Sequence, residues 1–238
     1  MVVGTGDGTV EELSWEGRGL RRWNLGWWVT WVGRSGDQVW AAHTGGKVVL
    51  LPGGEEFVTS GWVLCSAEGR EGLLLGTTNG KVYRLTPAGV EELLSLPRPI
   101  WAMISEGDKL WILDGKGLER IEDNKVSWTV EAWVAEPGVL VRFGDGVAFA
   151  GWLKGVKADD PRLTDYGRSP RMIICVDGRG EVVWRTSVGA RVRSLAVVRD
   201  EILVGCVDGV AYLVGEGEVR RYLPLWDRPR SLTWPTMG

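Results

Sequence analysis

The chain has 238 residues, 44% of them hydrophobic and 25% charged, as in an ordinary globular protein with room for a sizeable core. A formal net charge of -3 excludes the bulk positive field that draws proteins to nucleic acid, although local basic patches are compatible with it. No stretch approaches the roughly 18 apolar residues that span a membrane, and the first residues lack a signal-peptide pattern. We therefore expect a cytoplasmic protein with no membrane partner.

The sequence contains few cysteine and histidine residues that could bind a metal or a cofactor. Cys65, Cys175 and Cys206 are scattered, no Cys-x-x-Cys pair occurs, and His43 is the one histidine. A zinc site is hard to build from this set, so we expect three buried cysteines, no metal and no cofactor. Three asparagines and one glutamine among 238 residues are few, which favours a thermophilic source.

Short apolar runs separated by glycine-containing turns recur along the chain. The copies fall at residues 2–10, 39–50, 73–85, 110–118, 147–152 and 202–213. They recur at intervals of about 34–38 residues, except that the last interval is about 17 residues longer. Alternating Val, Leu, Ile and aromatic residues are typical of strands. Hairpin turns are predicted at Asp7-Gly8, Asn79-Gly80 and Asp208-Gly209, because both residues of each pair tolerate positive φ.

A further strand, often with a tryptophan, is predicted between the copies. These strands fall at about residues 26–32, 61–65, 98–104, 191–197 and 228–234. Four short strands per repeat of about 40 residues predict the blades of a β-propeller, with these strands innermost. We expect one all-β domain over residues 1–238, with six blades and almost no helix. Residues 228–234 would complete the blade begun by residues 2–24 and so leave no open sheet edge.

Several of these copies resemble known propeller repeats. Residues 175–186 carry an Asp, Gly, Trp pattern around Asp177 and Trp184, and residues 73–85 and 202–213 share a Gly-x-x-Asp/Asn-Gly element. The pattern is similar to the repeats of quinoprotein-like and WD40-like propellers. The resemblance implies the fold and says little about activity. Quinone enzymes of that family have eight blades and two adjacent cysteines, so quinone-dependent catalysis is not expected here.

The long interval corresponds to an insertion at about residues 154–171, between the second and third strands of the fifth blade. Long polar loops in compact domains are often functional. Its cations are Lys154, Lys157, Arg162, Arg168 and Arg171. Asp159, Asp160 and Asp165 meet no calcium-binding spacing rule, so a solvated loop is favoured over a metal site.

Arginines gather at the predicted starts of the inner strands, at Arg98, Arg191, Arg193, Arg228 and Arg230. In a propeller these starts share a face with the loops between second and third strands, so the arginines and the insertion are expected on one rim. That rim suits a carboxylate-rich protein, a phosphate or RNA. The structural alternative is arginine stacked on tryptophan or paired with Asp and Glu.

Fifteen tryptophans are mostly expected to be packing residues. Trp27, Trp62, Trp101 and Trp184 occupy comparable places in their repeats and are predicted to fill the spaces between blades, whereas Trp226 is predicted to be a surface anchor. No nucleophile elbow or P-loop occurs, and His43 is expected to be a structural residue near a turn.

The sequence therefore favours a non-catalytic scaffold that binds a protein partner through its arginine-rich, loop-bearing face, as part of a larger assembly. Two alternatives stay open. One is a hydrolase or lyase with its site at the channel mouth. The other is direct binding of RNA or the ribosome by the arginine rim.

Overall fold

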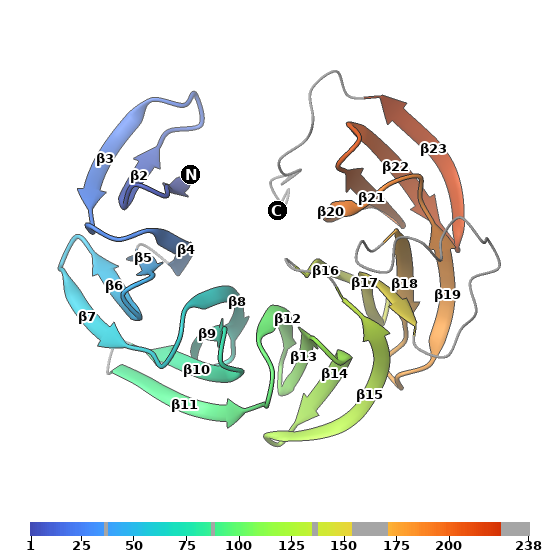
Figure 1. Ribbon diagram of the computed structural model, residues 1–238, viewed down its shortest axis with the longest axis horizontal. Coiled ribbons are helices and arrows are strands. Elements are labelled where there is room, and N and C mark those ends of the chain that lie inside the picture. The colour runs from blue at the N-terminus through green and yellow to red at the C-terminus, as the bar shows by residue number, and fades with distance from the viewer. Residues whose placement is uncertain (36–37, 87–88, 135–137, 154–170, 225–238) are drawn as a thin grey trace. The chain divides into compact units, whose positions relative to one another are not determined.

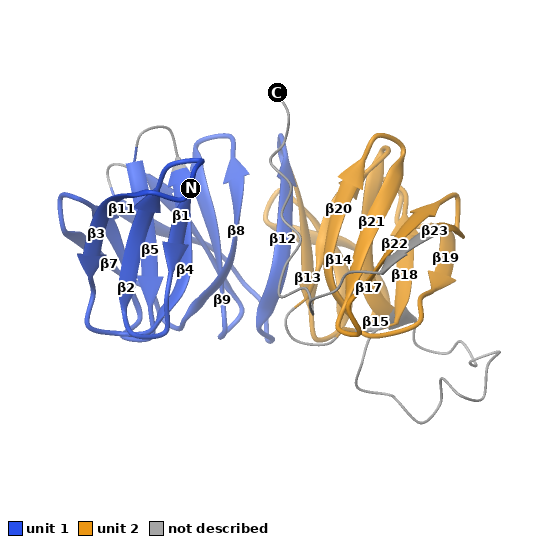
Figure 2. Cartoon of the chain, turned by 90° about the horizontal axis from the view of Figure 1, so that it is seen from above, with its two compact units in different colours: residues 1–108 blue, residues 109–238 orange. Residues whose placement is uncertain are grey.

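The computed structural model describes residues 1–35, 38–86, 89–134, 138–153 and 171–224, all of them in strands, turns and connections. Two compact units divide the chain, residues 1–108 and residues 109–238 (Figure 2). No helix occurs among the described residues, as predicted. It follows that no described helix is long and apolar enough to cross a membrane.

The first unit contains a three-stranded sheet in the order β1-β2-β3, followed by four-stranded sheets β4-β5-β6-β7 and β8-β9-β10-β11 (Figure 1). Its strands are β1 (Val2–Gly4), β2 (Thr9–Leu13), β3 (Gly19–Asn24), β4 (Val29–Ser35), β5 (Gln38–His43), β6 (Lys47–Leu51), β7 (Glu55–Val58), β8 (Val63–Gly69), β9 (Gly72–Thr77), β10 (Lys81–Thr86), β11 (Gly89–Ser95) and β12 (Ile100–Glu106). The first strands β4, β8 and β12 contact one another in succession.

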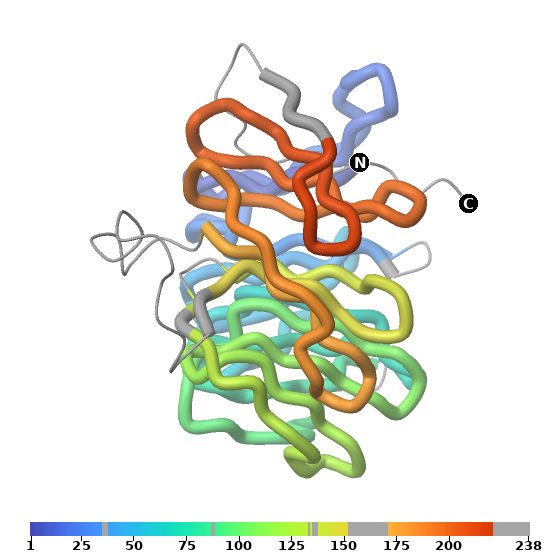
Figure 3. The backbone as a smooth tube through the Cα atoms, turned by 90° about the vertical axis from the view of Figure 1, so that its right-hand side faces the viewer, coloured from blue at the N-terminus to red at the C-terminus, as the bar shows by residue number. Residues whose placement is uncertain are grey.

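The second unit continues the pattern of antiparallel hairpins (Figure 3). Its strands are β13 (Lys109–Asp114), β14 (Gly117–Glu122), β15 (Lys125–Trp133), β16 (Leu140–Phe143), β17 (Gly146–Leu153), β18 (Met172–Val176), β19 (Val182–Ser187), β20 (Val192–Val198), β21 (Glu201–Cys206), β22 (Val210–Gly215) and β23 (Glu218–Pro224). A short pairing of β15 with β17 links two groups of strands, β16 pairs with β17, and β20-β21-β22-β23 form a separate sheet.

The predicted first strands of the blades are confirmed as β4, β8, β12 and β20, whereas residues 228–234 lie outside the described residues. Strand β16 was not predicted. The insertion indeed falls between β17 and β18, but of residues 154–171 only Arg171 is described.

The predicted turns are confirmed, but their backbone differs from the expectation. Gly8, Gly80 and Gly209 have φ of 89°, 82° and 81°, while the Asp or Asn before each does not adopt positive φ. That residue acts through its side chain instead: Asp7 Oδ1 accepts the Thr9 N–H at 3.0 Å. Only the glycine therefore needs the left-handed region.

The middle strands are buried on both sides, which explains their nearly unbroken apolar runs. On β5, Val39 and Ala41 join a cluster with Val10 of β2. Trp40 and Ala42 face the other way and pack with Leu75 of β9. Alternate side chains of one strand thus join it to the sheets on either side.

Candidate interaction surface

Backbone hydrogen bonds tie together the loops at one end of the first unit's sheets. Leu25 N–H bonds to Gly8 O at 2.8 Å, and Thr44 N–H bonds to Trp28 O at 2.9 Å. The series continues with Thr59 N–H to Gly46 O, Thr78 N–H to Trp62 O and Leu96 N–H to Gly80 O. We call residues 5–8, 25–28, 44–46, 59–62, 78–80 and 96–99 the loop face.

Three tryptophans of the loop face are exposed. Trp27, Trp28 and Trp62 expose 57%, 68% and 47% of their surface. The prediction that Trp27 and Trp62 fill the spaces between sheets is therefore wrong. Both precede the first residue of a strand by one or two positions, in the connections β3–β4 and β7–β8, so neither lies within a strand.

The β3–β4 connection is held firmly despite this exposure. Gly26 N–H donates to Asn24 Oδ1 at 2.8 Å, in addition to the bonds of Leu25 and Trp28. Gly8 packs directly beneath the connection: a Cβ atom on Gly8 would lie 2.8 Å from the Trp27 nitrogen. Glycine is thus required here both by φ and by the close approach of backbone.

His43 supports Trp27 from the end of β5. The two rings stack with centroids 6.4 Å apart and planes 13° from parallel. His43 is 4% exposed, and its Nδ1 accepts the Gly45 N–H at 3.0 Å, so the bound form is the one with Nδ1 unprotonated. Burial lowers the pKa of His43, with Glu56 acting in the opposite direction. The prediction of a structural histidine near a turn is confirmed.

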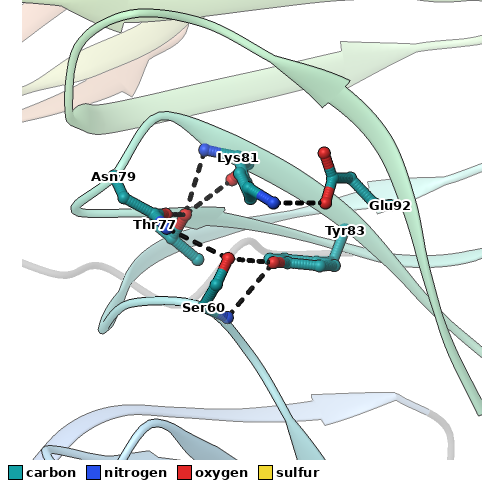
Figure 4. A network of polar contacts seen from close by, with 6 residues as sticks. All are labelled: Ser60, Thr77, Asn79, Lys81, Tyr83 and Glu92. Carbon is teal, nitrogen blue, oxygen red and sulfur yellow. Dashed lines mark hydrogen bonds and ion pairs between the residues drawn. The ribbon is translucent and has the colours of Figure 1, made fainter.

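A polar network holds the β7–β8 connection (Figure 4). Ser60 donates its N–H to the Tyr83 hydroxyl at 3.1 Å, and Ser60 Oγ lies 2.5 Å from the same oxygen. Asn79 Nδ2 donates to Ser60 Oγ at 3.0 Å. Trp62 N–H donates to Thr78 Oγ1 at 3.1 Å. The backbone beside the exposed Trp62 is therefore fixed by neighbouring hairpins.

Trp28 and Trp62 hold the same position in adjacent sheets. The Trp28 carbonyl accepts the N–H of Thr44, which directly follows β5, and the Trp62 carbonyl accepts the N–H of Thr78, which directly follows β9, both at 2.9 Å. The strands they precede, β4 and β8, are joined by a hydrogen bond from Trp31 Nε1 to Ser66 Oγ at 3.1 Å. Two equivalent tryptophans therefore stand on neighbouring strands of the same unit.

The loop face carries little charge. Asp7 and Arg98 are its two charged residues. The Asp7 pKa is lowered, mainly by a hydrogen bond from the Thr5 hydroxyl, so the carboxylate is ionised near neutral pH. Just outside the face, Lys47 pairs with Glu56, and Lys81 pairs with Glu92. The surface is thus aromatic and close to neutral.

The β19–β20 connection of the second unit has the same backbone pattern with other side chains. Arg191 O accepts the Val207 N–H at 2.9 Å, as the Trp28 and Trp62 carbonyls do in their sheets. Tyr212 receives a hydrogen bond from the Gly189 backbone, in the way that Tyr83 receives one from Ser60. Arg191 therefore occupies the position before β20 that Trp28 and Trp62 occupy before β4 and β8.

Only some of the predicted site residues are described. Arg98 and Arg191 are half-buried in the connections β11–β12 and β19–β20, and each has an interaction partner. Arg193 is half-buried on β20, and Arg171 is half-buried before β18. Lys154, Lys157, Arg162, Arg168, Trp226, Arg228 and Arg230 lie outside the described residues.

The remaining predictions on tryptophan and cysteine have mixed outcomes. Trp184 packs edge-on against Phe143 with centroids 5.9 Å apart, as predicted for a packing residue, and Trp101 is half-buried. Cys175 and Cys206 are buried, while Cys65 is partly buried, and burial raises the pKa of the Cys65 thiol to about 12. No group of metal-ligating side chains occurs in the described part of the chain.

Arginine does stack on tryptophan in this protein, inside the second unit. The guanidinium carbons of Arg120 and Arg142 lie 5.7 Å and 5.1 Å from the Trp111 ring centroid. Trp111 is almost fully buried. This cluster packs the unit and differs from the loop face, where the tryptophans are exposed.

No protein-family model and no curated protein sequence matches the chain. Solved structures do. A chain in the crystal structure of BBS1N in complex with ARL6DN is 12% identical to this chain. The match has a TM-score of 0.76 and covers 100% of this chain and 79% of that one. The WD40 β-propeller domain of Doa1 is 13% identical with a TM-score of 0.70, over 97% and 81%. The chain has a β-propeller fold.

BamB from Moraxella catarrhalis also matches the propeller, at 12% identity and a TM-score of 0.65, over 98% of this chain and 88% of that one. The expected resemblance to quinoprotein-like and WD40-like propellers is therefore confirmed. At this identity the likeness extends to the fold. The function has to be argued from the residues of this propeller's own surface.

Proposed function

We propose that this propeller is a non-catalytic module that binds a protein partner through its loop face. The observation that carries the proposal is the set of three exposed tryptophans on a hydrogen-bonded, rigid backbone. Tryptophan is enriched at the centres of protein interfaces and is unusual on an idle surface. A rigid anchor also loses little conformational entropy on binding, which favours affinity.

The structural neighbours support the same kind of role. BBS1N was crystallised in complex with a second protein, ARL6DN. This shows that a chain with this fold can present a surface to a protein. Propellers host many functions, so the exposed tryptophans of this chain support the proposal more strongly than the likeness does.

We assign the arginines of the recurring connections a supporting role at the rim of the interface. Arg98 belongs to the loop face, and Arg191 replaces tryptophan at the recurring position of the second unit. In this proposal Arg193, Arg228, Arg230 and the cations of residues 154–171 extend that rim toward acidic groups of the partner. Charged rim residues mainly speed association and add little to final affinity.

We further propose six blades, with residues 228–234 completing the first. The described part of the first sheet has three strands, whereas the next two have four. The sequence Arg228-Pro-Arg-Ser-Leu also repeats the pattern of residues 191–195, which open β20. Removing residues 226–238 should expose the edge of β1, lower the melting temperature and promote aggregation. A truncated chain that stays monomeric with an unchanged melting temperature would contradict this closure.

The protein-binding role is tested by affinity purification from an extract of the native organism, with mass spectrometry of the retained proteins and nucleic acids. We expect discrete proteins on the parent chain and on a Trp15→Ala control, and their loss on a Trp28→Ala/Trp62→Ala variant. Trp15 is 81% exposed but lies in the β2–β3 turn, at the opposite end of β2 from the loop face. Retention of RNA alone, or of nothing specific to the parent, would refute the proposal.

A further inference from the structure

Resting on the proposed function, we infer that the loop face takes an uncharged, apolar segment of its partner, with Trp28 and Trp62 as paired anchors. The partner's contacting side chains would be residues such as leucine or proline. This assignment differs from an acidic or phosphate-bearing partner, which the arginines alone would favour.

The distribution of charge on the loop face leads to this partner. Asp7 already accepts hydrogen bonds from Thr5 and Thr9, and Arg98 already has an interaction partner. The cations just outside the face are paired, Lys81 Nζ with Glu92 Oε2 at 2.6 Å. A charged side chain buried against the tryptophans would lose its hydration, and the charged groups of the loop face and its border already have partners of their own. An apolar side chain meets no such cost.

The apolar area is large enough to anchor a segment. If a whole tryptophan exposes roughly 200–250 Å², the exposed fractions of Trp27, Trp28 and Trp62 together amount to roughly 340–430 Å². The largest apolar patch of a typical monomer covers about 300–600 Å² and is often functional, so an exposed apolar area of this size on one face suits a binding role. Thr, Ser, Asn and Gly make up most of the rest of the loop face, as they do in antibody loops that recognise proteins.

The repetition of the anchor favours an extended segment over a single inserted side chain. Trp28 and Trp62 sit at equivalent positions on adjacent sheets, and β4 and β8 are bonded directly through Trp31 and Ser66. An extended segment of the partner could therefore contact Trp28 and Trp62 in succession. The hydrogen bonds of Ser60 and Trp62 hold the backbone beside Trp62 in place before the segment binds.

The test is selection of short random peptides displayed on phage against the intact protein, followed by titration of the selected peptides. We expect enrichment of leucine, proline and aromatic residues and depletion of Asp, Glu, Lys and Arg. Trp28→Ala and Trp62→Ala should each weaken binding by about 30-fold or more, as for an interface hot spot, while Trp15→Ala changes nothing. The affinity of these uncharged peptides should be nearly equal in about 0.05 M and about 0.5 M salt, because the peptides carry no group that could pair with the arginines of the rim.

The outcomes separate this inference from the proposed function. Selected peptides that are acidic, lose binding on Arg98→Glu and dissociate at high salt would overturn the apolar segment while the protein-binding role stands. Failure to select any peptide, with binding of fluorescent single-stranded RNA or self-association in light scattering, would overturn both. Apolar peptides whose affinity is unchanged in the Trp28→Ala/Trp62→Ala variant would also refute this site.

Discussion

The β7–β8 and β19–β20 connections share a pattern of backbone hydrogen bonds and differ in the side chains that they expose. In both, a tyrosine of the third strand, Tyr83 or Tyr212, bonds to the backbone two residues before the recurring Trp or Arg. The β7–β8 connection then exposes Trp62, whereas the β19–β20 connection buries Ala190 and half-buries Arg191. The hydrogen bonds of the fold position the loop, and the side chain at the recurring position is left to serve recognition.

Among changes to the loop face, the largest expected effect on stability comes from filling the space beneath the β3–β4 connection. Gly8→Ala places a Cβ 2.8 Å from the Trp27 nitrogen at a φ of 89°, so backbone must shift. We expect a loss of roughly 2–4 kcal/mol in the free energy of unfolding, measured by urea denaturation. Gly17→Ala is the control: its φ is 79°, but nothing lies within 4 Å, so the loss should be roughly 1 kcal/mol. Equal losses would show that the contact with Trp27 is not constraining.

The tyrosine hydroxyls come next. Tyr83→Phe removes the partner of the Ser60 N–H and Oγ, and should cost roughly 1–2 kcal/mol in unfolding free energy. Tyr212→Phe removes the equivalent bond of Gly189 and should cost a similar amount. Peptide binding separates the two variants. Tyr83→Phe should weaken the binding of the selected peptides, because the backbone beside Trp62 is held less firmly, whereas Tyr212→Phe should leave their binding unchanged. Weakening by both variants would contradict the division of roles.

A smaller effect is expected from pH. Because the folded-state pKa of His43 is lowered by burial, the folded protein favours neutral imidazole. This contribution to stability is present above the ordinary histidine pKa and is lost as pH falls through the lowered value. Asp7, Glu56 and Asp177 have lowered pKa values and also lose stability in acid, so the difference between the parent and His43→Gln isolates the histidine.

The parent's advantage over His43→Gln should shrink as pH falls from neutral to mildly acidic. Lys47 and Glu56 are the charged groups acting on this ring. Thermal melts of both chains over that range give the measurement. A difference that stays constant with pH would show that the Nδ1 contact with Gly45 does not depend on protonation.

The smallest change in stability is expected for the exposed tryptophans themselves. Trp28→Ala and Trp62→Ala should each alter the free energy of unfolding by no more than about 0.5 kcal/mol, because little packing is removed. Trp111→Ala, at a buried ring with two arginines stacked on it, should cost about 3–5 kcal/mol. A large loss of unfolding free energy in Trp28→Ala would show that Trp28 is a packing residue.

Strands and turns followed from the sequence because both depend on local pattern: apolar runs such as residues 73–75 and glycine after Asp or Asn. Strand β16 did not, since its four residues follow Pro137-Gly138 and repeat no clear motif. The tryptophans were misplaced because a shift of one position moves a side chain from a strand to the loop before it. The glycines at Gly26 and Gly61, directly before Trp27 and Trp62, were the available signal for a loop.

Hydrogen exchange of the intact protein with and without a selected apolar peptide shows directly whether the connections that carry Trp28 and Trp62 bind the peptide. We expect slower exchange on binding at the backbone amides of residues 26–28 and 61–62, and unchanged exchange at residues 189–191. Protection at 189–191, with none beside Trp28 and Trp62, would contradict it and transfer recognition to the arginine-bearing connection.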